Sequence, residues 1–158
     1  MATATYPAHM WPAKASASIR ADGAALGRSE WQDFGTGIYT VMTQIAAEAF
    51  GTAVSKVTFE LGDTGLSEAP ASGGSQTVAS VGPAVYAAVK AARAKLVQIA
   101  VEDTLPPRHS LAADDVIADN GWLIDCNYSD RRESMVAMVE RHAAWARPAC
   151  RGSLAPAV

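Results

Sequence analysis

The sequence has few of the residues that build metal or disulfide frameworks. Its two cysteines, Cys126 and Cys150, stand 24 positions apart, and it contains no Cys-x-x-Cys pair. Neither an iron–sulfur nor a zinc framework is therefore encoded. The histidines His9, His109 and His142 share no ligand spacing with each other or with the cysteines. We predict no metal held by protein ligands, and two ordinary thiols in a reducing compartment.

Clustered positive charge, long apolar runs and a leader peptide are also missing. Lys and Arg number 13 against 16 Asp and Glu, whereas a nucleic-acid surface needs clustered cations. No apolar run approaches the roughly 18 residues of a membrane span. No Lys or Arg precedes Lys14 and no continuous apolar segment follows, so a secretory signal is not indicated. We expect no nucleic-acid partner, no membrane partner and a cytoplasmic location.

Aromatic side chains are scarce, and alanine takes their place. Aromatics make up 7% of the 158 residues, while hydrophobic residues make up 49%. This length suits one domain or one piece of a larger domain. The abundance of alanine favours close packing of helices rather than bulky anchors.

The N-terminal half alternates strand and helix patterns. Extended runs over 15–21 and 24–31 flank Asp22-Gly23, which predicts a hairpin with a type I′ turn. A helical stripe then begins at Ile38 and ends at Gly51, a residue suited to a helix C-terminus; it comprises Ile38, Val41, Met42, Ile45, Ala46, Ala49 and Phe50. Residues 55–61 alternate apolar and polar side chains, which predicts a strand.

The C-terminal half contains two further helices and a hairpin. One helical stripe comprises Val81, Val85, Val89, Ala92, Leu96 and Ile99, and Pro83 is acceptable only near the first turn of this helix. Pro106-Pro107 predicts a loop, and Asn120-Gly121 predicts the turn of a hairpin over 115–126. A shorter helix follows, with Ser129 or Asp130 as its cap and Met135, Met138, Val139 and His142 on one face.

These patterns predict an α+β fold in the order ββαβαββα, with a mixed or antiparallel sheet and helices packed on it. Residues 1–146 form the folded unit. The Pro-, Gly- and Ala-rich residues 147–158 are expected to form a frayed tail.

Two glycine-containing loops each lead into a helix. They are Gln32–Gly37 ("QDFGTG") and Ser72–Gln76 ("SGGSQ"). The first N–H groups of a helix lack internal partners and carry the positive end of the helix dipole. Glycine lets an anion approach the backbone closely, and Thr36, Ser72 and Ser75 add hydroxyl donors. Together the loops could grip two ends of one extended anionic ligand.

Ordinary turn chemistry explains either loop taken alone, because glycine-rich turns before helices are common. Neither loop matches the phosphate-binding pattern GxxxxGK[ST], and neither matches GxGxxG after a strand. The residues by themselves therefore indicate an anion or cofactor cradle and nothing more specific.

The loops in series resemble those of a known enzyme family. "QDFGTGIYTVMTQIAAEAFG", followed by "KVTFELGDTGLSEAPASGGSQTVASVGPAVYAAVKAARAKL", is similar to the large molybdopterin-binding subunit of the xanthine dehydrogenase/aldehyde oxidoreductase family. The similarity runs from Thr5 to Leu96 and continues more weakly to His142. The Thr-Gly-x-Tyr-Thr variant at Thr36 looks closest to the bacterial aldehyde-oxidoreductase branch.

The resemblance implies that both loops contact a molybdenum–molybdopterin cofactor, in many bacterial members its cytosine dinucleotide form. Carried over by matching positions, the first loop would lie near the pterin and molybdenum end, through Gly35, Thr36 and Gly37. The second loop would hold the phosphates or the pterin, through Ser72, Gly73, Gly74, Ser75 and Gln76. The family often has Gly-Gln-Gly in the first loop, so Thr36 puts that side-chain contact in doubt.

The family's catalytic motifs do not occur in this sequence. The resemblance implies a base supplied by the Glu of a Gly-x-Gly-Glu motif, and a further cofactor loop of the type GGxFGGK. Neither occurs here, and Glu60 and Glu68 do not match the catalytic position. No catalytic residue is therefore assigned, and we expect the chain to be inactive alone.

The chain thus resembles an internal segment of a longer subunit, part of a larger molybdopterin-binding domain. Hydroxylation of an aldehyde or N-heterocycle would need the remaining segments of the subunit, together with iron–sulfur and FAD subunits. Such complexes can be exported on a partner's signal, so the periplasm is the alternative location. Two other interpretations stay open: a non-catalytic module that binds an anion or nucleotide, and an inactive remnant.

Overall fold

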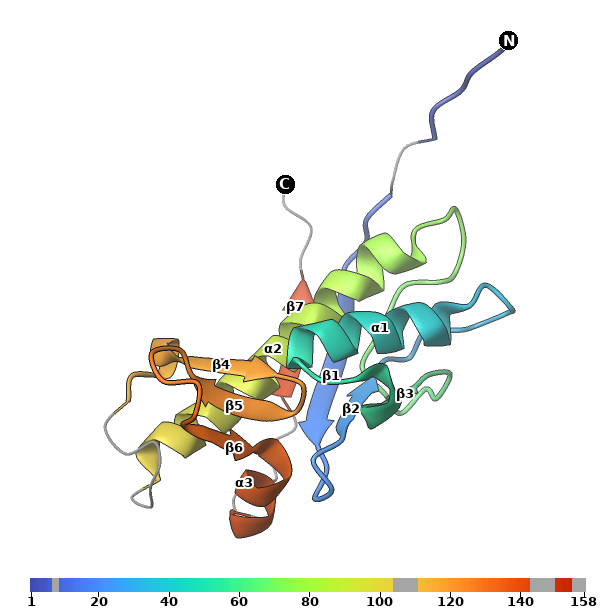
Figure 1. The fold of residues 1–158 in the computed structure, drawn as a ribbon. Helices are drawn as coiled ribbons and strands as arrows, with labels where there is room; N and C mark the ends of the chain where they lie inside the picture. The colour runs from blue at the N-terminus through green and yellow to red at the C-terminus, as the bar shows by residue number, and fades with distance from the viewer. Residues whose placement is uncertain (7–8, 104–110, 143–149, 155–158) are drawn as a thin grey trace.

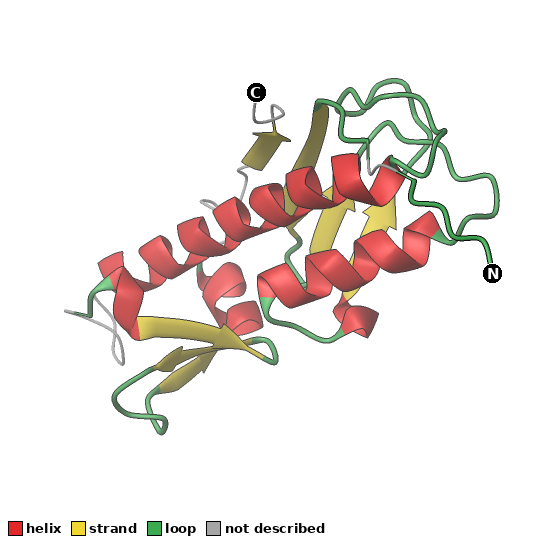
Figure 2. Ribbon diagram, turned by 90° about the horizontal axis from the view of Figure 1, so that it is seen from above, coloured by secondary structure: helices red, strands yellow, loops and turns green. Residues whose placement is uncertain are grey.

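The computed structural model describes residues 1–6, 9–103, 111–142 and 150–154. Within them the order of strands and helices is ββαβαβββαβ, and the strands form two sheets. The helices α1 (Ile38–Phe50) and α2 (Thr77–Glu102) lie side by side on one face of the larger sheet (Figures 1 and 2). This arrangement confirms the predicted α+β class with helices packed on a sheet.

The larger sheet is mixed and has the strand order β3-β2-β1-β7. Its strands are β1 (Ala13–Ile19), β2 (Ala25–Arg28), β3 (Val57–Glu60) and β7 (Cys150–Leu154). β1 pairs antiparallel with β2 and with β7, whereas β2 and β3 run parallel. A short 3₁₀ turn over Val54–Lys56 precedes β3, so the expected strand over 55–61 is shorter than predicted.

The first hairpin is confirmed, but its turn type is not the one predicted. Gly23 has a φ of 75°, whereas Asp22 is not among the residues of positive φ, and a type I′ turn needs both. The Gly23 N–H donates to the Arg20 carbonyl at 2.9 Å, and the Arg20 N–H donates to the Ala24 carbonyl at 2.8 Å. These bonds define a type I turn followed by a G1 bulge, in which only the glycine needs the left-handed conformation.

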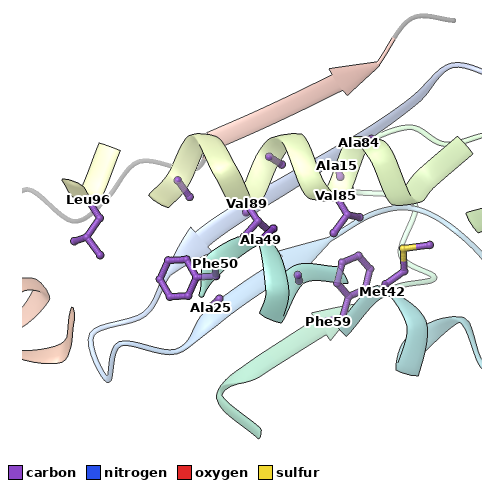
Figure 3. Packing of buried hydrophobic residues seen from close by; sticks show 14 of the residues in the cluster. Ala15, Ala25, Met42, Ala49, Phe50, Phe59, Ala84, Val85, Val89 and Leu96 are labelled. Atoms are coloured by element: carbon purple, nitrogen blue, oxygen red, sulfur yellow. The ribbon is translucent and has the colours of Figure 1, made fainter. Parts of the chain in front are cut away.

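The core lies between the sheet and the two helices and is built largely from small side chains. On β1, buried Ala13, Ala15 and Ala17 alternate with polar residues that point away from the helices. Ala84, Val85 and Val89 of α2 and the larger Phe50 and Met42 of α1 belong to the same buried cluster (Figure 3). Small residues on both layers allow close approach, as the alanine content predicted.

Helix α2 begins earlier than its apolar stripe suggests. It starts at Thr77, which puts Pro83 inside the helix and not in its first turn. Proline lacks an N–H group, so the carbonyl four residues earlier loses its helical bond there. Ser80, Val81 and Gly82 are buried, and their packing offsets that loss, so Pro83 lies deeper in the helix than its residue type predicted. The start at Thr77 agrees with the loop Ser72–Gln76, which was predicted to lead into this helix.

The smaller sheet is antiparallel in the order β4-β5-β6 and lies beside the C-terminal half of α2 (Figures 1 and 2). β4 (Val116–Asp119) and β5 (Trp122–Asp125) are joined at Asn120-Gly121, where both residues have positive φ, so the predicted hairpin is confirmed. β6 (Arg132–Ser134) was not predicted.

The third helix, α3 (Met135–Arg141), has a different cap from the one predicted. The Ser134 side chain accepts a hydrogen bond from the Ala137 N–H at 3.2 Å, whereas Ser129 and Asp130 lie in the turn before β6. Pairing with β5 holds Arg132–Ser134 extended and delays the helix. His142 follows the last helical residue.

Strand β7 lies within residues 147–158, where the sequence predicts a frayed tail. Its backbone pairs with β1 from Ala17↔Cys150 to Ala13↔Leu154. This strand forms because it pairs with β1, which lies more than 130 positions earlier in the chain, so the local sequence does not predict it. Pro106-Pro107, His109, the end of the third predicted helix and the rest of the tail lie outside the described residues.

Gly51 joins the two parts of the fold. It ends α1 in the left-handed conformation, as predicted, and its N–H bonds the Ala47 carbonyl at 2.9 Å. Its carbonyl accepts from the Gly121 N–H at 3.0 Å. A Cβ on Gly51 would collide with the carbonyl of Ala118 on β4. The close approach of the smaller sheet to the end of α1 therefore requires glycine.

Candidate functional site

The two glycine loops meet at one end of the helix pair. Both helices begin on the same side of the molecule, so the loops before them are neighbours (Figures 1 and 2). Between them lies a cleft of about 490 Å³, which residues of both loops and of both first helical turns line: Phe34, Thr36, Ile38, Val41, Ser72, Gly73, Gly74, Ser75, Thr77 and Val78.

The second loop is a tight turn with an unusual backbone. Gly74 and Ser75 both have positive φ, at 56° and 57°, and Ser75 is one of two non-glycine residues in the described chain with that property. The Gln76 N–H closes the turn on the Gly73 carbonyl at 3.2 Å. A non-glycine residue in this region carries a conformational cost, and such residues often cluster at binding sites.

The start of α2 borders the cleft with N–H groups that have no acceptor within the helix. The first helical bond runs from the Ser80 N–H to the Gln76 carbonyl at 2.9 Å, so the N–H groups of Thr77 and Val78 precede it. No side chain caps this end, and its first turn holds no acidic residue. The Ser72 and Thr77 hydroxyls lie 3.4 Å apart beside it. The second-loop wall therefore combines backbone donors, hydroxyls and the positive end of a 26-residue helix.

The first loop differs, because an internal carboxylate occupies its donors. Asp33 Oδ1 accepts the Gly35 N–H at 2.8 Å and the Thr36 N–H at 3.1 Å, and it lies 3.5 Å from the Thr36 hydroxyl. The backbone N–H of Gly35, with smaller contributions from Thr36 and Tyr39, lowers the pKa of the Asp33 carboxyl. The two walls of the cleft are therefore electrostatically unlike, although the sequence showed a glycine loop on each.

Apolar side chains line the rest of the cleft. Phe34 and Val78 are exposed, at 66% and 45% of their full surface. Ile38 and Val41 of α1 also line it. Apolar surface beside backbone donors is typical of pockets that bind a ring system with a polar tail.

The predicted site residues fall into two groups. Thr36, Ser72, Gly73, Gly74 and Ser75 line the cleft. Gly35, Gly37 and Gln76 belong to the same loops but do not line it. Gly37 stands in the left-handed conformation before α1, and the Gln76 side chain donates to the Ala71 carbonyl at 2.9 Å.

Sequence reasoning missed the roles of Gln32 and Asp33. The Ser72 N–H donates to Gln32 Oε1 at 3.3 Å, which ties the second loop to the first. Asp two residues before a glycine is a known turn signal, so Asp33 could have been found. The hydrogen bond between Ser72 and Gln32 depends on the tertiary fold, so no sequence pattern predicts it.

The carboxylates that did not match a catalytic position are engaged in surface ion pairs. Glu60 pairs with Arg28 at 2.6 Å, and Glu68 pairs with Lys14 at 3.0 Å. Among the residues that the structure describes, no cluster of three or more His, Cys, Asp or Glu side chains could hold a metal. Within the same residues, no helix has the length and apolar character that crossing a bilayer requires.

Solved structures share this fold. Quinoline 2-oxidoreductase from Pseudomonas putida 86 superposes with a TM-score of 0.74 at 18% identity, over 90% of this chain and 18% of that one. The Cu,Mo-CO dehydrogenase in its carbon monoxide reduced state gives 0.71 at 20% identity, over 92% of this chain and 18% of that one. Reconstituted CO dehydrogenase from Oligotropha carboxidovorans gives 0.72 at 20% identity, with the same coverage.

Comparison with curated protein sequences finds no match. The chain spans about a fifth of the length of the solved chains it resembles. The model of the molybdopterin cofactor-binding domain family matches residues 1–153, nearly the whole chain. The match agrees with the resemblance carried by the two loops, and the chain belongs to the molybdopterin cofactor-binding domain family.

Proposed function

We propose that the cleft between the two loops binds a molybdenum–molybdopterin cofactor. The observation that supports this proposal is the convergence of both glycine loops and the N-terminus of α2 on one cleft, in a chain of this family. The eight residues of the cofactor site are Gly35, Thr36, Gly37, Ser72, Gly73, Gly74, Ser75 and Gln76. Five line the cleft, and the other three shape its loops.

The cleft suits one end of such a ligand in size and chemistry. Its volume of about 490 Å³ lies within the usual range for small-molecule sites. We assign the phosphates to the second-loop wall, where the Ser72 and Ser75 hydroxyls and the unpaired N–H groups of α2 supply donors. We assign the ring system to the apolar surface of Phe34 and Val78. The cytosine dinucleotide form follows from the resemblance to bacterial members.

The residues of this chain bind and orient the cofactor. When bound, the cofactor supplies the redox chemistry for hydroxylation of an aldehyde or an N-heterocycle. Gly73 lines the cleft, and a Cβ there would meet no other atom within 4 Å, so its backbone is open to contact with a ligand. The apolar side chains exclude water from the ring end. The resemblance implies a proton-transfer Glu in a Gly-x-Gly-Glu motif, which this sequence does not contain, so that group would come from elsewhere in the working enzyme.

The partners follow from the same proposal. The remaining segments of the molybdenum subunit would close over the cleft. Iron–sulfur and FAD subunits would carry electrons away, and a small aldehyde or heterocycle would be the substrate. We propose that such a complex works in the cytoplasm, with the periplasm as the alternative if a partner subunit carries an export signal.

The test compares cofactor content between two glycine variants. Gly73→Ala adds a methyl group at the cleft, in open space and at an ordinary backbone angle. Gly65→Ala is the matched control outside the cleft, because Gly65 also has an ordinary backbone angle and its Cβ would approach only the Asp63 side chain. Each protein would be purified from a host that makes the cytosine dinucleotide form, then assayed for molybdenum and for oxidised-pterin fluorescence.

We expect wild type and Gly65→Ala to retain molybdenum and pterin, and Gly73→Ala to lose most of both while its stability stays within about 0.5 kcal/mol. Equal pterin content in all three proteins would refute the assignment of the cleft. Retention of simple nucleotides with no pterin would favour a non-catalytic nucleotide-binding module.

A further inference from the structure

The two walls of the cleft carry opposite electrostatic character. None of the residues that line the cleft is charged. On the second-loop side, the first turn of α2 holds no acidic residue. On the first-loop side, Asp33 immediately precedes Phe34, and its carboxylate accepts hydrogen bonds from the next loop residues. A ligand in the cleft therefore meets donors on one wall and a fixed negative charge behind the other.

Asp33 also determines the shape of the first loop. The Gly35 N–H at 2.8 Å and the Thr36 N–H at 3.1 Å both point to Oδ1, so one oxygen atom fixes two consecutive peptide groups. Gly35 stands at a φ of 97°, a conformation open to glycine. The same carboxylate holds the Thr36 hydroxyl at 3.5 Å. Thr36 lines the cleft, so Asp33 acts on the ligand surface through Thr36.

We propose that Asp33 is a positioning and specificity residue, which fixes the first loop and keeps anionic groups away from that wall of the cleft. The proposal rests on the assignment of the cleft as a ligand site. It deepens that assignment, because the charge of Asp33 gives a physical reason for the direction in which the ligand would lie. A ligand with one anionic end must place that end against Ser72–Ser75 and its uncharged, donor-bearing end against Thr36.

Two substitutions separate the two roles of Asp33. Asp33→Asn keeps a side-chain oxygen that can accept the Gly35 and Thr36 N–H groups but removes the charge. Asp33→Ala removes both. Asp63→Asn is the matched control. Asp63 Oδ1 accepts the Gly65 N–H at 2.8 Å in the same type of turn, but Asp63 and Gly65 lie outside the residues that line the cleft.

The experiment uses backbone amide NMR of the full chain, with inorganic pyrophosphate as the probe. In wild type and Asp63→Asn, we expect pyrophosphate to shift the amide signals of residues 73–79 and to leave those of Gly35 and Thr36 unchanged. In Asp33→Asn, the Gly35 and Thr36 signals should respond as well, and pyrophosphate affinity should rise about threefold or more, since an exposed, screened like charge has been removed.

The conformation of the first loop is tested by amide hydrogen exchange in the absence of pyrophosphate. Amide exchange at Gly35 and Thr36 should quicken in Asp33→Ala and stay near the wild-type rate in Asp33→Asn. A rescue by asparagine shows that the acceptor oxygen fixes the loop, whereas equal acceleration in both variants would overturn that role.

The two loops report on different claims. The exclusion role of Asp33 is wrong if pyrophosphate shifts the Gly35 and Thr36 amide signals equally in wild type and in Asp33→Asn. It is also wrong if pyrophosphate shifts these signals in neither protein. If residues 73–79 stay silent in every protein, the cleft is not the phosphate site and the proposed function fails instead.

Discussion

The backbone N–H of Ser72 donates a hydrogen bond to Oε1 of Gln32 at 3.3 Å, across 40 positions of sequence. The bond joins the two loops that border the cleft. Each loop leads into its own helix, so the packing of α1 against α2 brings the two walls together, and this contact ties the loops to each other.

Replacing Gln32 should therefore loosen the cleft and leave the fold unchanged. An exposed, neutral hydrogen bond contributes about 0.5–1 kcal/mol, so Gln32→Ala should lower the free energy of unfolding by no more than that. Amide hydrogen exchange at Ser72 should quicken several-fold. Gln44→Ala is the control, because Gln44 is exposed on α1 away from the cleft. Unchanged exchange at Ser72 in Gln32→Ala would contradict the bridge.

The sequence predicted both loops, and the structure explains why it could not predict how they differ. Glycine spacing before a helix is a local signal, so "QDFGTG" and "SGGSQ" looked equivalent. Their difference comes from one carboxylate, that of Asp33, which occupies the donors of the first loop only. The hydrogen bond from Ser72 to Gln32 depends on how α1 and α2 pack together, so it cannot be predicted from the local sequence around either residue.

A side chain at Gly74 should lower the stability of the protein. Its φ is 56°, and a Cβ would approach the Tyr6 hydroxyl to 3.1 Å. Gly74→Ala should cost about 1 kcal/mol through the left-handed backbone and should shift Tyr6. Urea unfolding measures the first effect and the Tyr6 ring NMR signals measure the second. Identical stability and Tyr6 signals in Gly74→Ala and wild type would show that the turn has another conformation.

The junction at Gly51 should be the most sensitive glycine outside the loops. Gly51 and Gly62 have similar φ values of 77° and 81°, but only Gly51 faces a neighbour, the Ala118 carbonyl. Gly62→Ala should cost about 1 kcal/mol, the backbone penalty alone. Gly51→Ala should cost at least about 1 kcal/mol more, because β4 must move away. Urea unfolding of the pair isolates the packing contribution; equal losses would rule out the close approach.

Hairpins and helices with strong local signals were predicted well, and elements that depend on distant partners were not. Asn120-Gly121 and Gly51 behave as their residue types indicate. β6 and β7 were missed because pairing with β5 and β1 creates them. Tertiary packing also keeps α2 continuous through Pro83.

The Cys126 thiol should react slowly despite its exposure. Desolvation first, then the carboxylates of Asp115 and Asp125, raise the pKa of this thiol. A raised pKa means less thiolate at neutral pH, so the alkylation rate should reach its midpoint at a higher pH than that of an unhindered cysteine. Iodoacetamide kinetics across pH, in a Cys150→Ser background, measures this.

Asp115→Asn supplies the comparison for Cys126. The Cys126 Sγ donates to Asp115 Oδ1 at 3.8 Å, so removing that charge should lower the thiol pKa and speed alkylation at neutral pH. The effect should be partial, because desolvation and Asp125 remain. Slower alkylation of Asp115→Asn than of wild type would contradict the claim that Asp115 raises the pKa of the Cys126 thiol.

The most direct measurement is a crystal structure of the chain purified with its cofactor from a host that makes it. We predict phosphate density against Ser72–Ser75 and the start of α2, with the ring end toward Phe34 and Thr36. Cofactor density outside the cleft would contradict the site. Phosphates against Asp33 and Thr36 would contradict the direction in which the ligand is held.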